Sequence, residues 1–505
     1  MKRHVSWLFV LLAAVSSCEQ LSPEMQLIHD AADALGGVEA VQGVTTLRVE
    51  GSGSYYRLGQ NRTPDAALPE AEVQSYTLEQ DLQNHRMRTE TTSANFAGRL
   101  GSAVTAMDKN VAWDIGQDAP RRVGEVVARE RHVEFYHHPV ALLQAALSDG
   151  EPEATVSGLR QEMGHDLVDI TTADGSELTL HVDPGTKQML MVSSTAYNSN
   201  LGDVVITTSF SDYADVDGLM LPQEISTTID ELPGRELRVS HAVNVETSDL
   251  IAPAEVTSAS EPGPRPANVT DEEIAASVWL LAGQSHHSIL IEFSEYTALV
   301  EAPQNDTRAL AVIARARELV PDKPLRYLVN THHHFDHSGG VRAAVSEGLT
   351  VITHETNQVL YEDLVSRSHT VMTDHLAENP AELVLETVPG DETHELSDGR
   401  RVVEIFRVGD NPHCDGVLLV YLPAERILIQ ADLYIPGIGG PFAESAAALL
   451  QTIRDRGLRV NQLVPVHGMI QSLSDLEEAV AATEAGANCR QGRSVGCDGV
   501  TIVET

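Results

Sequence analysis

The chain has 505 residues, more than a single hydrophobic core usually supports, so its length indicates two folded domains. It contains 34 Lys and Arg against 74 Asp and Glu, which gives a formal net charge of -40 at pH 7. Because this charge repels phosphate backbones and anionic membrane surfaces, nucleic acid is excluded as an expected partner.

The N-terminus has the pattern of an export signal. Lys2 and Arg3 precede an apolar stretch, residues 7–15, that is too short to span a bilayer permanently. Small residues then lead to Cys18, in a pattern that resembles the signal peptide of bacterial lipoproteins. The resemblance implies that residues 1–17 are removed and that a lipid on Cys18 anchors the protein in the bacterial cell envelope, in the periplasm or on the outer membrane. Ordinary secretion with cleavage near Ser17 is the alternative.

Residues 18–250 are predicted to form a mainly antiparallel β domain. Residues 25–35 have the pattern of a helix, and Gly36 and Gly37 supply the stop signal expected after it. Apolar and polar residues then alternate in segments separated by turn residues, which predicts one large sheet with one buried face. The clearest of these segments are residues 72–78, 166–171, 177–182, 203–210 and 236–245.

A second resemblance concerns this β domain as a whole. The opening helix, residues 35–40 and residues 212–222 resemble the lipoprotein-carrier-like domains of the bacterial envelope, which are curved half-barrels that can shelter acyl chains. The resemblance implies a half-barrel-like N-terminal domain. His137 and His138 precede Pro139 in this region, a context typical of a surface turn rather than of a metal site.

The composition changes after the β domain. Residues 251–276 are rich in Pro, Ala, Ser, Thr and Glu without periodicity, which predicts a linker. In residues 277–487 strand-like and helix-like segments alternate, which predicts an α/β domain. Residues 488–505 form a tail in which Cys489 and Cys497 can either pair or remain free thiols. With only four cysteines in the chain, a disulfide framework cannot hold the protein together.

The strongest chemical signal follows the apolar, strand-like residues 325–329. From residue 331 to residue 340 the sequence reads Thr-His-His-His-Phe-Asp-His-Ser-Gly-Gly. A loop at a strand end can aim several side chains at one point. His332 and His334 alternate so that both can face one metal ion, while Asp336 and His337 can reach a second.

This run resembles the His-x-His-x-Asp-His signature of the metallo-β-lactamase superfamily, and the match is complete. The likeness covers about residues 278–473 and implies the αββα sandwich of that family. It also implies three further ligands at strand ends, which the sequence supplies in order as His413, Asp432 and His467. By this resemblance His332, His334 and His413 hold the first of two zinc ions, Asp336, His337 and His467 hold the second, and Asp432 bridges both. Iron or manganese could occupy the same ligands.

The resemblance implies a dinuclear zinc-dependent hydrolase in which a metal-bound hydroxide attacks the substrate and Asp336 and Asp432 are catalytic. The expected substrate is a small molecule with an ester, lactone, thioester or amide bond, amphiphilic if the N-terminal domain presents it. By this resemblance Asp432 corresponds to the bridging carboxylate of the glyoxalase II, lactonase and phosphodiesterase members. The zinc β-lactamases of the superfamily lack this carboxylate. The alternatives are β-lactamase or phosphodiesterase activity, or a non-catalytic lipid or lipoprotein carrier with a vestigial metal domain.

Three further residues are candidates for the substrate pocket. His286 and His287 lie in a turn between strand-like segments, where a loop of this family overhangs the metals. Tyr434 follows Asp432 by two residues and could donate a hydrogen bond to a developing oxyanion. Cys414, directly after the third ligand histidine, is predicted to be a packing residue.

Overall fold

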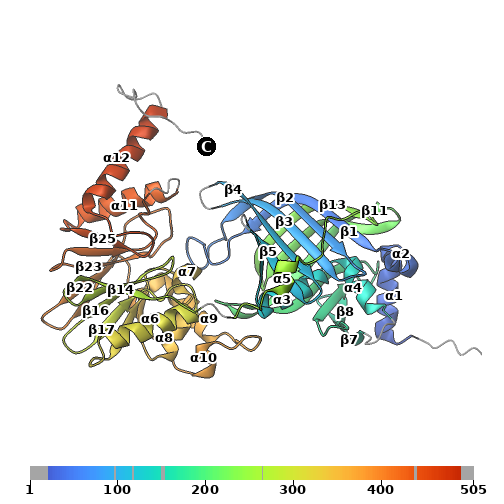
Figure 1. Ribbon diagram of the computed structural model, residues 1–505, viewed down its shortest axis with the longest axis horizontal. Helices are drawn as coiled ribbons and strands as arrows, with labels where there is room; N and C mark the ends of the chain where they lie inside the picture. The colour runs from blue at the N-terminus through green and yellow to red at the C-terminus, as the bar shows by residue number, and fades with distance from the viewer. Residues whose placement is uncertain are drawn as a thin grey trace, which may run out of the picture.

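The computed structural model describes residues 21–95, 98–116, 119–148, 154–263, 266–436 and 441–490. They form two domains that lie end to end along the long axis of the molecule (Figure 1). Cys18 and Cys497 lie outside the described residues, and with them the expected lipid anchor and the choice between a Cys489–Cys497 pair and two free thiols. Within the described ranges, no helix has the length and apolar character needed to cross a membrane.

The N-terminal domain is built on a 13-stranded antiparallel sheet, as the alternating pattern predicted. The strand order is β6-β5-β4-β3-β2-β1-β13-β12-β11-β10-β9-β8-β7, so β1 and β13 pair where the start and the end of the domain meet. The strands are β1 (Thr46–Tyr56), β2 (Glu70–Asp81), β3 (Arg86–Ala94), β4 (Leu100–Asp108), β5 (Val111–Ile115), β6 (Pro120–Arg122), β7 (Thr155–Glu162), β8 (His165–Thr171), β9 (Glu177–Val182), β10 (Met189–Asn198), β11 (Gly202–Val216), β12 (Leu219–Ile229) and β13 (Leu232–Val243).

Helices α1 (Pro23–Leu35), α2 (Val38–Gln42), α3 (Glu125–Phe135) and α4 (Pro139–Ala146) accompany this sheet. Helix α1 begins where Ser22 accepts a hydrogen bond from the Met25 amide, and it ends at Gly36, whose φ of 135° suits glycine. Its buried residues recur at helical spacing and join residues of α4 and of the sheet in one core. The helices therefore cover the apolar face that the strand pattern predicted.

The C-terminal domain contains two packed sheets. The first runs in sequence order from β14 to β20 and the second from β21 to β25. The strands of the first are β14 (Thr270–Ala275), β15 (Val278–Ala282), β16 (Ser288–Glu292), β17 (Thr297–Val300), β18 (Leu325–Val329), β19 (Thr350–His354) and β20 (Val384–Val388). Those of the second are β21 (Thr393–Ser397), β22 (Val402–Arg407), β23 (Leu418–Leu422), β24 (Ile427–Gln430) and β25 (Gln462–Pro465).

Helices cover the outer faces of both sheets. They are α6 (Asp306–Leu319), α8 (Val341–Ser346), α9 (Gln358–Ser366), α10 (His375–Glu378), α11 (Pro441–Asp455) and α12 (Leu473–Arg490), whereas the short helix α7 (Phe335–Ser338) lies in the segment that follows β18. Ile289 of β16 packs between the sheets with Val420 of β23, whereas its neighbour Leu290 faces the helices α6 and α8. Helices α11 and α12 pack on the other side, against the second sheet (Figure 1). The result is an αββα sandwich, as the family resemblance implied.

The boundary between the domains differs from the expected one. The expected linker, residues 251–276, contains α5 (Ala254–Ser258) and the whole of β14. Val256 of α5 is buried against Trp113 of the N-terminal domain, and β14 pairs with β15 as the edge strand of the C-terminal domain. The sequence did not predict α5 and β14, because both elements are short and half-exposed and their segment is rich in proline and small polar residues.

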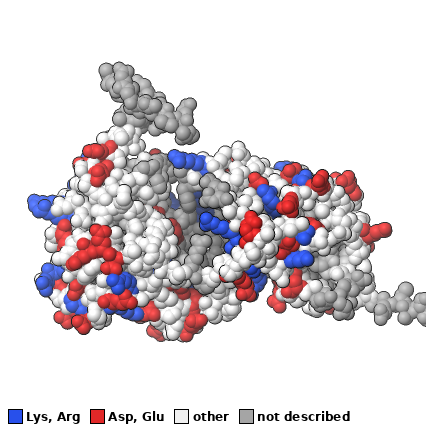
Figure 2. All heavy atoms as spheres, in the orientation of Figure 1, with Lys and Arg blue, Asp and Glu red and all other residues white. Residues whose placement is uncertain are grey.

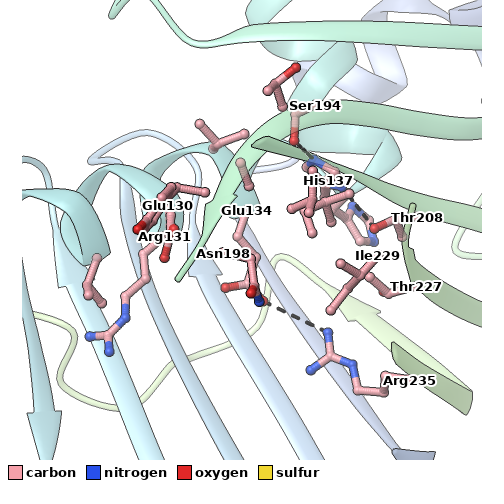
Figure 3. A pocket seen from close by; sticks show the side chains of 18 of the residues that line it. Glu130, Arg131, Glu134, His137, Ser194, Asn198, Thr208, Thr227, Ile229 and Arg235 are labelled. Carbon is pink, nitrogen blue, oxygen red and sulfur yellow. Dashed lines mark hydrogen bonds and ion pairs between the residues drawn. The ribbon is translucent and has the colours of Figure 1, made fainter. Parts of the chain in front are cut away.

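His137 and His138 were expected in a surface turn, but both rings lie inside the N-terminal domain. His138 is 3% exposed and accepts a hydrogen bond from the Val140 amide at the start of α4. His137 lines a cavity of about 410 Å³, where its ring contacts the Ser194 and Thr208 hydroxyls at 2.8 and 2.9 Å (Figure 3). The following proline begins a helix here rather than a turn, which places both rings inside the domain.

Candidate metal centre

All seven predicted ligands lie beyond strand ends of the two packed sheets. The His-rich motif follows β18 and runs into α7, so His332 and His334 lie in the loop and Asp336 and His337 in the short helix. His413 lies in the loop after β22, Asp432 follows β24, and His467 follows β25. The structure brings the seven side chains together in one cluster.

The first group consists of His332, His334 and His413. Each offers a ring nitrogen that lies within 4.8 Å of the others, and Cys414 lies within the same limit. The Nε2 atoms of His332 and His413 are 3.2 Å apart. The Nδ1 atom of His334 is buried and has no hydrogen-bond partner. The group therefore offers three imidazoles to one point.

The second group consists of Asp336, His337 and His467, and the structure adds His286 to it. The Nε2 atoms of His337 and His467 are 3.3 Å apart. The Nε2 atom of His286 lies 3.2 Å from Oδ2 of Asp336. Of the two histidines expected near the substrate, one thus belongs to the cluster itself.

Asp432 lies between the two groups. Its Oδ1 atom is 3.1 Å from Nε2 of His467, and its Oδ2 atom is 3.3 Å from Nε2 of His337 and 3.5 Å from Nε2 of His413. The backbone of Asp432 is left-handed, with a φ of 57°, a conformation that is uncommon away from glycine and frequent at functional sites. The carboxylate is therefore placed to serve both groups.

A buried carboxylate behind the cluster fixes the ring of His337. Oε2 of Glu301 lies 3.0 Å from Nδ1 of His337, and Oε1 accepts a 2.7 Å hydrogen bond from the Thr331 amide. The side chains of Glu301 and His337 are both fully buried. Because Nδ1 donates to the carboxylate, Nε2 is the nitrogen that faces the cluster.

Burial and charge set the protonation states. Burial lowers the pKa of His332 and of His334 well below the usual range, and it lowers the pKa of His413. Burial also acts to lower the pKa of His337, but the Asp432 and Glu301 carboxylates outweigh it and raise that pKa well above its usual value. The rings of His332, His334 and His413 are therefore neutral, as metal ligands must be. The raised pKa of His337 means that the two buried carboxylates favour a positive charge beside them.

These observations fit a divalent transition metal. Two nitrogens that each lie about 2.0–2.1 Å from one tetrahedral zinc are roughly 3.3 Å apart, which matches the separations of 3.2 and 3.3 Å between the paired Nε2 atoms. The unpartnered, buried Nδ1 of His334 also requires a partner that the protein does not supply. The seven residues are thus suited to two metal positions that share Asp432.

Sequence comparison relates the region around the cluster to a known protein family. The model of the metallo-beta-lactamase superfamily matches residues 282–472, the range that contains all seven residues. The C-terminal domain belongs to this superfamily. No curated protein matches the chain.

Solved structures resemble part of the chain. The metallo-beta-lactamase from Pontibacter korlensis is 21% identical and aligns over 43% of this chain and 99% of its own, with a TM-score of 0.34. The enzyme from Hirschia baltica is 19% identical over 43% and 97%, with a TM-score of 0.33. FIM-1 from Pseudomonas aeruginosa, in its mono-zinc form, is 20% identical over 44% and 98%, with a TM-score of 0.34.

Two residues expected in the substrate pocket have other partners in this metallo-β-lactamase domain. The Tyr434 hydroxyl donates to the main-chain oxygen of Asp475 at 3.2 Å, and the ring packs in the core beneath α11 and α12. The proposed oxyanion donor is therefore turned away from the cluster, which corrects that expectation. Nε2 of His287 lies 2.9 Å from the Gly468 main-chain oxygen, so this ring ties its loop to the segment after His467. Cys414 is fully buried, as a packing residue would be.

The sequence reasoning missed three residues around the cluster. Glu301 follows β17 directly and has a φ of 69°, and a charged residue that ends a buried apolar strand was an available signal. Gln60 and Asn61 come from the N-terminal domain and contact the motif of the C-terminal domain. Nothing in their own sequence context distinguishes them from ordinary turn residues.

Proposed function

We propose that this protein is a dinuclear, zinc-dependent hydrolase. The observation that carries the proposal is the position of Asp432 between two groups of histidines that each suit one metal ion. When bound, two such ions supply an activated water molecule and a Lewis acid that stabilises developing negative charge. Hydrolysis is the reaction class that needs both.

The protein's own residues orient these components. Asp336 is the most exposed of the ligand carboxylates, with 39% of its side chain accessible, so it lies where substrate and water enter. Burial acts to raise the pKa of Asp336, but the hydrogen bond from His286 and the charge of His337 hold it well below the usual range. The ionised carboxylate can therefore accept a hydrogen bond from water and orient it. Asp432, buried behind it, supports both groups at once.

We propose an ester, lactone, thioester or amide as the substrate. A polyanionic phosphodiester would be repelled by the net charge of -40. Figure 2 shows acidic side chains over both domains with basic ones among them, and the coloured atoms of that face form no continuous basic surface. A neutral or weakly charged small molecule suits this surface better.

The proposal places the hydrolase in the bacterial envelope. The export pattern and Cys18 support attachment to a membrane through a lipid, on a protein whose bulk remains in the periplasm or outside the outer membrane. The N-terminal sheet would then lie near lipids and could present an amphiphilic substrate.

The test is a panel of ester, lactone, thioester, amide, β-lactam and phosphodiester substrates, with metal-loaded wild type, His334→Ala and Asp432→Ala. We expect turnover of one bond class and a loss of at least about 100-fold in both variants, since each removes a ligand. His394→Ala, which changes a half-buried histidine of the same domain that pairs with Glu386, is the control and should keep full activity. Equal turnover in all four proteins would exclude the proposal, and turnover of β-lactams or phosphodiesters alone would replace its substrate class.

A further inference from the structure

A loop of the N-terminal domain is seated on the metal-site motif. This β1–β2 loop, residues 57–69, joins the first two strands of the large sheet. The Phe335 amide donates to the Gly59 main-chain oxygen at 3.2 Å, and the Asp415 amide donates to that of Arg62 at 2.8 Å. A Cβ atom on Gly59 would lie 2.2 Å from the Phe335 ring, and the φ of Gly59 is 69°. Glycine is therefore required for this approach.

The main chain of Asn61 determines which nitrogen of His334 faces the cluster. The Asn61 main-chain oxygen lies 3.1 Å from Nε2 of His334 and 2.8 Å from Nε2 of His333. A carbonyl oxygen only accepts, so Nε2 of His334 carries the hydrogen and the neutral ring keeps its lone pair on Nδ1. That atom is the buried nitrogen without a partner in the first group.

Gln60 acts in the same way on the second group. Its Nε2 atom donates a 2.9 Å hydrogen bond to Oδ1 of Asp336, a residue 276 positions later in the chain. The other oxygen of that carboxylate, Oδ2, is then left beside His286 and His337. One amide thus fixes the rotation of the most exposed ligand.

We propose that the N-terminal domain completes the metal centre, with Gln60 and the Asn61 main chain as positioning groups for Asp336 and His334. The inference rests on the proposed function, because it requires that these residues hold metal. Outer partners of metal ligands typically contribute about 10–100-fold to metal affinity. The N-terminal domain therefore contributes to the affinity of the C-terminal domain for its metals.

The experiment measures zinc affinity in the full chain by competition with a chromophoric chelator, together with the absorption spectrum of the cobalt-loaded protein. Gln60→Leu keeps the size of the side chain but removes the donor, and we expect one of two metals to bind about 10–100-fold more weakly. Gly59→Ala pushes the loop away from Phe335 and should weaken both metals. Both variants should alter the cobalt spectrum, which reports ligand geometry and which a merely structural role would leave unchanged. Ala67→Ser, an exposed position of the same loop, should match wild type in every measurement.

The outcomes separate this inference from the proposed function. Wild-type metal affinity and cobalt spectra in folded Gln60→Leu and Gly59→Ala, with Asp432→Ala deficient in metal, overturn the inference alone. A wild-type chain that holds no metal, or an Asp432→Ala chain that holds as much as wild type, overturns both. If Gly59→Ala does not fold, Gln60→Leu decides, because its side chain is only partly buried and its loss leaves the loop's main-chain bonds in place.

Discussion

At the level of single residues, Glu301 is the buried carboxylate that accepts a hydrogen bond from Nδ1 of His337, while Nε2 of the same ring faces the cluster. Replacing Glu301 by glutamine keeps its size but places an amide against Nδ1, which can reverse the orientation of the ring's hydrogen. We expect Glu301→Gln to weaken one metal by about 10–100-fold with little change in folding. Chelator competition measures this, with Glu292→Gln, whose partner is Lys323, as the control. Unchanged affinity would show that Glu301 does not orient His337.

The clustering of the seven residues was predictable because four of them share one short spaced motif and the other three each follow an apolar strand after a short loop. Their local sequence therefore carries the signal. Gln60 and Asn61 were not predictable, since their role depends on a contact between segments 276 and 273 positions apart. Tyr434 was predicted wrongly because spacing from Asp432 does not determine which way a side chain turns after a strand.

We expect His137, in the cavity of the N-terminal domain, to make the stability of the protein depend on pH. Burial lowers the pKa of His137 from 6.5 to about 4, so the folded state binds its proton less readily than the unfolded state does. Stability is therefore complete above pH about 6.5 and is lost as the pH falls toward about 4, by about 3 kcal/mol at most.

His137→Gln keeps hydrogen bonds to Ser194 and Thr208 possible and removes the titration. The free energy of unfolding, measured by urea titration between pH 7 and pH 4, should depend less on pH in this variant than in wild type. Identical slopes in the two proteins would mean that His137 does not contribute to acid sensitivity.

At the scale of elements, helix α6 holds the loop that carries His286. Arg308 of this helix is 1% exposed, and its guanidinium donates to the main-chain oxygens of Asn268, Leu281, Ala282 and His286. Burial without a carboxylate partner lowers the pKa of Arg308. A side chain that satisfies four carbonyls joins the helix to the edge of the first sheet.

Arg308→Met should therefore destabilise the C-terminal domain by about 3 kcal/mol or more, because it leaves buried carbonyls without donors. Arg315→Met on the same helix removes only exposed pairs with Asp271 and Glu318 and should cost about 1 kcal/mol or less. Denaturant unfolding measures both. Equal losses in the two variants would contradict the role assigned to Arg308.

The elements were the most predictable level. The helix expected at residues 25–35 is α1, and the strand expected at 325–329 is β18, because apolar periodicity and short buried runs are strong local signals. β14 was missed because it is a short edge strand whose residues 270–273 are exposed. Its place in the sheet depends on β15, which the local pattern does not reveal.

At the scale of the whole molecule, the domains are joined at a second place besides the β1–β2 loop. Asp203 of β11 accepts hydrogen bonds from the Thr370 and Val371 amides at 2.9 Å. Burial acts to raise the pKa of Asp203, but the hydrogen bonds from the Thr370 hydroxyl and from both amides hold it below the usual range. Leu201 and Val204 are buried in the core of the C-terminal domain. The two domains should therefore unfold as one cooperative unit.

Asp203→Ala removes the acceptor at this junction and should lower the stability of the joined molecule by about 1–3 kcal/mol. In scanning calorimetry, we expect the single transition of the wild type to broaden or divide in the variant. Asp215→Ala, on the same strand but outside the junction, is the control. Two separate transitions already present in wild type would contradict the coupling of the domains.

We have proposed that seven side chains hold two metal ions around Asp432. The most direct test of this proposal is the metal content of the purified, zinc-loaded chain, measured by mass spectrometry for wild type and for Asp432→Ala. We expect about two equivalents of zinc in wild type and fewer in the variant, because a single carboxylate serves both positions. No tightly held zinc in wild type, or the same content in both proteins, would contradict it.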